Sequence, residues 1–217
     1  MSQLAINGGN KIREKAWPKW PIIGESELEQ MTATIKSGIW GYNGPQERKF
    51  AREFAEYIGT QYAIPVANGT VSLQIALEAL GIGFGDEVIV PGLTWQATAS
   101  ACLDVNAIPI LVDVEPESWC IDADKSEEAM TERTKAIIIV QPMRREPGVE
   151  LQSYFNFVFR YDQNAFRGLA VQQFRAALSA ELGCEVKPCY EPLNNCQLYR
   201  PLTKNRYSMF KVFLSSP

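Results

Sequence analysis

Residues 62–77, YAIPVANGTVSLQIAL, decide the fold. They predict a short apolar strand at Tyr62–Val66, a tight turn at Asn68 and Gly69, and a helix that opens with Thr70. A helix start presents unpaired backbone N–H groups and the positive end of the helix dipole, which together favour an anion such as phosphate. Gly69 leaves the backbone open to close approach, and the Thr70 hydroxyl can donate to a phosphate oxygen or cap the helix. An ordinary strand-to-helix turn looks the same, so the residues alone leave both interpretations open.

The residues that follow alternate between apolar strand patterns and helix patterns, with short turns such as Gly83–Asp86 between them. Continuous apolar runs without polar alternation indicate strands that are covered on both faces. The segment from about Tyr62 to Val140 is therefore predicted to be α/β with a mainly parallel sheet. The predicted strands are Glu87–Pro91, Ile108–Val114 and Thr134–Val140, and the predicted helices run through Ser100–Leu103 and from a cap at Asp124 with Glu127 three residues on.

Three patterns lie outside this segment. A Gly/Asn/Pro turn around Tyr42 leads into a predicted helix at Gln46–Ile58. Phenylalanines that alternate along Phe155–Phe159 predict a strand with one buried face. Apolar residues on one stripe of Phe174–Leu182 predict a helix that stops at Gly183 and packs against a core.

Several motifs occur in the order of one known family, and the chain resembles the DegT/DnrJ/EryC1/StrS aminotransferases. These enzymes use pyridoxal phosphate (PLP) to aminate keto-sugars or keto-cyclitols, and the resemblance is strongest to the branch that aminates an inosose with glutamine as donor. The motifs are Ser37–Gly44, Phe50, Asn68-Gly69-Thr70, Gly85–Pro91, Thr94-Trp95 and Pro109–Val114, and then, in the C-terminal part, Tyr154–Arg160, Phe174–Leu178 and Tyr190–Asn194.

The resemblance implies a fold and a domain division. It implies an α/β architecture in which residues 1–140 form an incomplete fold-type I (aspartate aminotransferase-like) large domain that binds PLP. Residues 141–150 would be a junction, and residues 151–217 a partial small α+β domain. The match is expected to cover about Ile6 to Val140 and about Leu151 to Tyr207, and a homodimer is expected from the complete family.

The resemblance also implies binding residues. Gly69 and Thr70 would hold the PLP phosphate, and Trp95 would stack on the pyridine ring, since an indole offers a large apolar face. Tyr42 would lie near the mouth for the keto-sugar or keto-cyclitol and for an amino donor such as glutamine or glutamate. Without the resemblance, Trp95 is better interpreted as a core or boundary aromatic residue, and Tyr42 as part of a turn.

Catalytic residues are not expected in this chain. Family members continue after the strand at residues 137–140 into a His-x-Tyr-Gly segment, an acidic residue that pairs with the pyridine nitrogen, and a Ser-Phe-x-x-x-Lys stretch with the Schiff-base lysine. Here the match breaks at Gln141, resumes near Leu151, and lacks all three, as if about half of a family-length chain were deleted. Lys187, Lys204 and Lys211 do not lie in such a motif, and the chain contains no histidine. Transamination needs an amine that moves a proton and an acid that keeps the ring protonated, so covalent PLP attachment is not expected.

Composition excludes several other classes. A net charge of −4 provides no excess of positive charge for binding nucleic acid. No apolar run is long enough to span a membrane, and the N-terminus has no signal-peptide core, so we expect a cytoplasmic protein. The five cysteines are expected to be reduced, and their spacing without histidine fits no common metal site. These are Cys102, Cys120, Cys184, Cys189 and Cys196.

The sequence is compatible with three functions. The first is a sugar or cyclitol aminotransferase that is internally deleted and inactive alone. The second is a non-catalytic phosphate- or PLP-binding or dimerisation module that pairs with a complete homologue. The third is an unrelated α/β enzyme with a phosphorylated ligand, which the ordered motifs disfavour.

Overall fold

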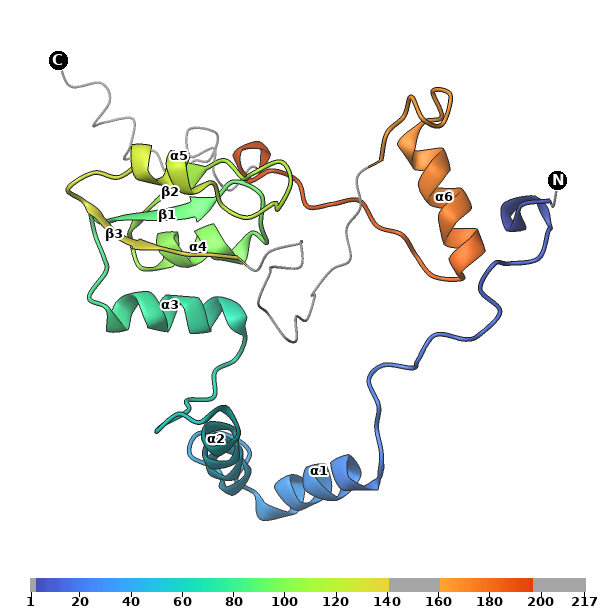
Figure 1. Ribbon diagram of the computed structural model, residues 1–217. Helices are drawn as coiled ribbons and strands as arrows, with labels where there is room; N and C mark the ends of the chain where they lie inside the picture. The colour runs from blue at the N-terminus through green and yellow to red at the C-terminus, as the bar shows by residue number, and fades with distance from the viewer. Residues whose placement is uncertain (1–2, 141–160, 197–217) are drawn as a thin grey trace, which may run out of the picture. The chain divides into compact units, whose positions relative to one another are not determined.

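The computed structural model describes residues 3–140 and 161–196 (Figure 1). The chain divides into two compact units, the first made of residues 1–67 and 163–186 and the second of residues 68–162 and 187–217. The predicted junction at 141–150 and the predicted strand at Phe155–Phe159 lie outside the described residues. The domain boundaries given above therefore stay a prediction.

In the first unit, helix α6 holds the N-terminal segment through a buried carboxylate. Glu181 is 7% exposed and accepts hydrogen bonds from the backbone N–H of Ala5 (2.8 Å) and of Ile12 (3.1 Å). Gly183 ends α6 in the left-handed conformation, as predicted. The elements of this unit are η1 (Ala5–Asn7), α1 (Glu25–Ser37), α2 (Pro45–Ile58) and α6 (Val171–Leu182).

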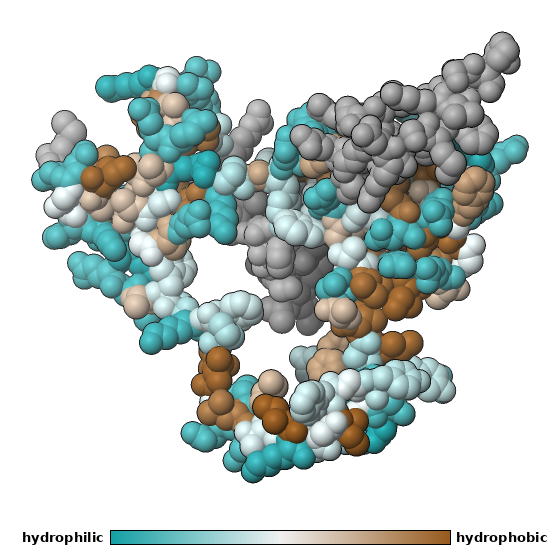
Figure 2. All heavy atoms as spheres, turned by 180° about the vertical axis from the view of Figure 1, so that it is seen from behind, coloured by the Kyte–Doolittle hydropathy of each residue, from teal (hydrophilic) through white to brown (hydrophobic). Residues whose placement is uncertain are grey.

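Helices α1 and α2 are stabilised by local capping more than by burial. The side chain of Glu27 accepts from the Gly24 N–H at 2.7 Å, and that of Glu47 accepts from the Gly44 N–H at 3.3 Å. These contacts are one half of a capping box, in which the N3 carboxylate accepts from the N-cap backbone, because an N-cap glycine has no side chain for the other half. Only Ala55 of the two helices is buried, so hydrophobic side chains remain at the surface (Figure 2).

The second unit is built on a three-stranded parallel sheet with strand order β2-β1-β3. The central strand, β1, is buried along its whole length, whereas β2 and β3 each have one described strand neighbour. The prediction of an α/β chain with a parallel sheet is confirmed. Its elements are α3 (Gly69–Ala79), β1 (Glu87–Pro91), α4 (Ala97–Asp104), β2 (Ile108–Val112), α5 (Ala123–Glu128), β3 (Thr134–Ile137) and η2 (Leu193–Asn195).

The core of the second unit lies between the sheet and its helices. Helix α4 packs on β1 and β2, and α3 packs on α4 (Figure 1). Leu193 of η2, which is distant in sequence, belongs to the same core and is 1% exposed. Burial of such a leucine contributes about 1.5–3 kcal/mol. The buried core residues are Leu77, Ile82, Val88, Val90, Ala99, Ala101, Cys102, Val105, Ala107 and Leu193.

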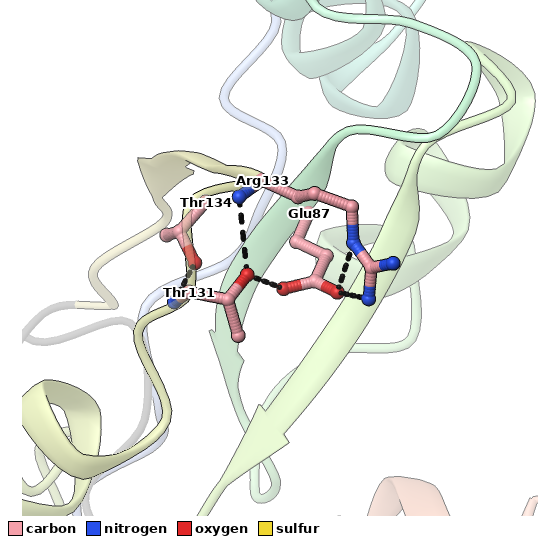
Figure 3. Close-up of polar contacts among 4 residues, drawn as sticks. All are labelled: Glu87, Thr131, Arg133 and Thr134. Carbon is pink, nitrogen blue, oxygen red and sulfur yellow. Dashed lines mark hydrogen bonds and ion pairs between the residues drawn. The ribbon is translucent and has the colours of Figure 1, made fainter.

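A polar cluster joins the start of β1 to the turn before β3 (Figure 3). The carboxylate of Glu87 accepts hydrogen bonds from the Thr131 hydroxyl at 2.6 Å and from Arg133 Nε at 2.9 Å, and it forms an ion pair with Arg133 Nη2. The Thr131 hydroxyl and the Arg133 guanidinium together lower the pKa of Glu87 below its ordinary value. The cluster fixes these two strands at the edge of the sheet where both begin.

The structure corrects four local predictions. Strand β2 ends at Val112 and not at Val114. Residues 62–66 do not form a strand, because no described strand pairs with them and an unpaired strand leaves its backbone groups unsatisfied. Asp122 caps α5 in place of Asp124, by accepting from the Lys125 N–H at 3.1 Å. Strand β3 ends at Ile137, although the Ile138 N–H still donates to the Ile89 carbonyl at 2.9 Å.

Candidate functional site at the carboxyl edge of the sheet

The candidate site lies where β1 ends and α3 begins. Because α3 leads through a short turn into β1, its N-terminus and the carboxyl end of β1 lie at the same edge of the second unit (Figure 1). The segment after β1 carries Trp95 to this edge. In open α/β sheets, ligands bind outside the carboxyl ends of the strands.

The start of α3 offers two backbone donors. Its first residues are Gly69 and Thr70. The described residues provide no hydrogen-bond acceptor for the backbone N–H groups of these two residues. Asn68, and not Thr70, caps the helix, since the Asn68 side chain accepts from the Val71 N–H at 3.1 Å. The Thr70 hydroxyl is therefore not used by the cap. The sequence signal for Asn68 was its strong preference for the N-cap position.

Gly69 faces open space. Its φ is not positive, and an added Cβ would meet nothing within 4 Å. Neither the backbone conformation nor the packing of the described residues requires glycine here. The open space beside Gly69 leaves the start of α3 accessible to an anion.

Trp95 lies four residues after the end of β1. It is 62% exposed, which disfavours the interpretation as a core residue. The Tyr190 ring meets it edge-on, with centroids 5.6 Å apart and planes at 65°. The preceding residue, Thr94, is buried and shares a 3.0 Å hydroxyl–hydroxyl hydrogen bond with Thr98 of α4, which anchors the turn that carries Trp95.

Tyr42 belongs to the first unit, where its side chain is 96% exposed. The next residue, Asn43, has a positive φ of 58°, in keeping with the predicted turn. The other three predicted site residues belong to the second unit. A role for Tyr42 at a substrate mouth therefore stays a prediction.

Two lysines of the second unit contact nearby acceptors. Lys125 pairs with Asp113 at 3.3 Å, and Lys135 donates to the Glu132 carbonyl at 3.4 Å. The hydrogen bond from the Val114 N–H and the contact with Lys125 lower the pKa of Asp113. Burial raises the pKa of the Cys102 thiol to about 11, so this cysteine is uncharged and inert at neutral pH.

The described residues carry no group of three or more His, Cys, Asp or Glu side chains that could hold a metal ion. All five cysteines are free thiols. No helix within residues 3–140 and 161–196 is long and apolar enough to cross a membrane.

Known proteins resemble about two thirds of the chain. It is 49% identical over 143 residues to L-glutamine:2-deoxy-scyllo-inosose aminotransferase of Streptomyces lividus, and 49% identical over 145 residues to L-glutamine:scyllo-inosose aminotransferase of Streptomyces griseus. The first alignment covers 63% of this chain and 34% of the relative, the second 64% and 34%. The chain thus spans about a third of the length of these relatives.

A solved structure gives the same result. Spr1654 of Streptococcus pneumoniae, described as a sugar aminotransferase and solved in both a PMP form and a PLP form, is 36% identical in the aligned region. For the PMP form, the TM-score is 0.52, with 55% of this chain and 30% of that chain covered. The observed part of the fold is therefore part of the fold-type I architecture of PLP-dependent aminotransferases.

Residues 21–143 match the DegT/DnrJ/EryC1/StrS aminotransferase family. The matched range contains Tyr42, Gly69, Thr70 and Trp95 and ends where the sequence departs from the expected motifs. The second predicted stretch, from about Leu151 to Tyr207, lies beyond it and stays a prediction. The chain belongs to the DegT/DnrJ/EryC1/StrS aminotransferase family.

Proposed function

We propose that this chain is the phosphate- and ring-binding part of a PLP-dependent aminotransferase of keto-sugars or keto-cyclitols, with glutamine or glutamate as amino donor. One observation carries the proposal. Two backbone N–H groups at the start of α3, for which the described residues provide no acceptor, and the exposed Trp95 both lie at the carboxyl edge of the sheet. The relatives that match the same residues are aminotransferases of inososes that use L-glutamine.

The residues present fit two parts of PLP, the phosphate and the ring. The N–H groups of Gly69 and Thr70 and the Thr70 hydroxyl are donors for its phosphate, and the Trp95 indole supplies a flat apolar face for its ring. When bound, PLP supplies an electron sink for a carbon that loses a proton. The family's lysine and its acid for the pyridine nitrogen have no counterpart in the sequence. We therefore expect the chain alone to bind PLP non-covalently and to catalyse no transamination.

A titration with PLP, followed by absorbance, tests this proposal. Thr70→Ala should weaken PLP binding about tenfold, because a hydrogen bond to a charged group is worth about 1.5–3 kcal/mol. Pyridoxal, which lacks the phosphate, serves as the matched ligand and should bind Thr70→Ala and the unchanged chain equally. Thr70→Ser keeps the hydroxyl and should restore PLP binding.

Two outcomes would overturn the proposal. Equal affinity of the unchanged chain for PLP and pyridoxal would remove the phosphate site at α3. Borohydride reduction that fixes PLP to one lysine in stoichiometric amount would show that a substitute lysine exists, and the chain would then be a shortened working enzyme.

A second function has its own support. Strand β3 has only β1 as a described neighbour, and its Ile137 side chain is 38% exposed, with Ile139 beyond it 72% exposed. Such an edge is a template for another chain. A non-catalytic module that pairs with a complete homologue would use it. Co-purification of the chain with an intact relative supports this function, and a monodisperse monomer in their mixture would contradict it.

A further inference from the structure

The segment at residues 188–196 reaches the candidate site from a distant part of the sequence. Its anchor is Leu193, which is 1% exposed within the core of the second unit. The Leu193 N–H donates to the Gly92 carbonyl at 2.8 Å, directly after β1 ends. Both contacts hold this segment beside the turn that carries Trp95.

Tyr190 lies three residues before this anchor, on the indole of Trp95. The 65° angle between the planes and the 5.6 Å centroid distance define an edge-to-face pair. Such a pair restricts the rotation of the indole about its side-chain bonds while it covers little of the ring. Trp95 remains 62% exposed, so the contact orients the indole without closing the site.

We propose that Tyr190 is a positioning residue for ring binding, because its edge contact holds the Trp95 indole in the orientation that receives a flat heteroaromatic ring. The inference rests on the function proposed above and adds a residue outside the matched range 21–143. Tyr190 acts through Trp95 and takes no part in proton transfer. Its role requires the aromatic ring, and the phenol hydroxyl is not needed.

The test compares Tyr190→Ala with Tyr190→Phe in the full chain, with PLP and pyridoxal as probes. Tyr190→Ala should weaken the binding of both probes by the same factor, about two- to tenfold, because the ring contact and not the phosphate contact is affected. Tyr190→Phe keeps the edge contact and should bind both as the unchanged chain does. Tyr57→Ala, which removes an 86% exposed tyrosine of α2, is the matched control and should change neither affinity.

A second readout follows Trp95 directly without ligand. The fluorescence anisotropy assigned to Trp95, taken as the difference from Trp95→Phe, should fall in Tyr190→Ala and stay unchanged in Tyr190→Phe. A loss of fold would instead alter the far-ultraviolet circular dichroism, which should not change.

The outcomes separate the two proposals. If the unchanged chain binds neither probe, both proposals fail. If it binds PLP more tightly than pyridoxal, and Tyr190→Ala binds them as tightly as the unchanged chain, the function stands and the role of Tyr190 is overturned. A loss of affinity in Tyr190→Phe equal to that in Tyr190→Ala would also overturn it, because the hydroxyl would then be the active group.

Discussion

Strands β1 and β3 are neighbours in one parallel sheet, yet they differ in how much of each is buried. All five residues of β1 are buried, whereas the residues of β3 alternate between half-buried and exposed. The sequence predicted both as strands covered on two faces. The difference teaches that an apolar run indicates the capacity for burial, and that the neighbours of the strand decide whether burial occurs.

The sharpest test of this comparison uses Ile89 and Ile137, which lie opposite each other in the β1–β3 pairing. Ile89 is fully buried and Ile137 is 38% exposed. Ile89→Ala should lower the free energy of unfolding by about 2–5 kcal/mol, because it leaves a cavity. Ile137→Ala should cost about 1 kcal/mol, because its site can relax into solvent. Urea unfolding measures both, and equal losses would show that β3 is covered as β1 is.

A smaller effect is expected at Leu193, which joins the core of the second unit from a distant part of the sequence. Leu193→Ala should cost about 2 kcal/mol, at the lower end for a buried leucine, since a short 3-10 helix can settle into the space left behind. Leu169→Ala, at a 36% exposed leucine of the first unit, is a matched control and should cost less. Thermal unfolding at fixed pH provides the measurement. An unchanged midpoint for Leu193→Ala would mean that η2 does not contribute to the core around β1.

The smallest effect concerns the polar cluster that links the starts of the two strands. The lowered pKa of Glu87 means that its ionised form stabilises the fold above its ordinary pKa of 4.5. This contribution is lost as the pH falls through the lowered pKa of the folded state. Glu87→Gln should therefore lose less stability between pH 7 and acid pH than the unchanged chain does.

The control for that experiment is Asp124→Asn, which removes an exposed carboxylate of α5. Its stability should follow the pH as that of the unchanged chain does. Identical acid sensitivity of Glu87→Gln and the unchanged chain would show that the ion pair with Arg133 does not link β1 to the turn before β3.

Much of the second unit could be predicted from local patterns. Apolar runs predicted strands β1 and β2, and a run of small residues predicted helix α4. In the predicted turn at Gly83–Asp86, the Asp86 N–H donates to the Gly83 carbonyl at 3.1 Å. For the Thr70 hydroxyl the sequence left capping of α3 and phosphate binding both open, and the structure places the cap at Asn68. Both Asn68 and Thr70 can cap a helix, and only the backbone geometry selects between them.

The sequence by itself determined the family and the α/β order, and it placed Gly69 and Thr70 at a helix start and Trp95 shortly after a strand. These features depend on residue types at fixed spacing along the chain. Only the tertiary structure decided that residues 62–66 stay unpaired, that β3 has one half-buried and one exposed face, and that Leu193 and Tyr190 reach the end of β1. These features depend on contacts between residues far apart in the chain. No local pattern encodes them, since the free energy of burial and pairing belongs to both partners.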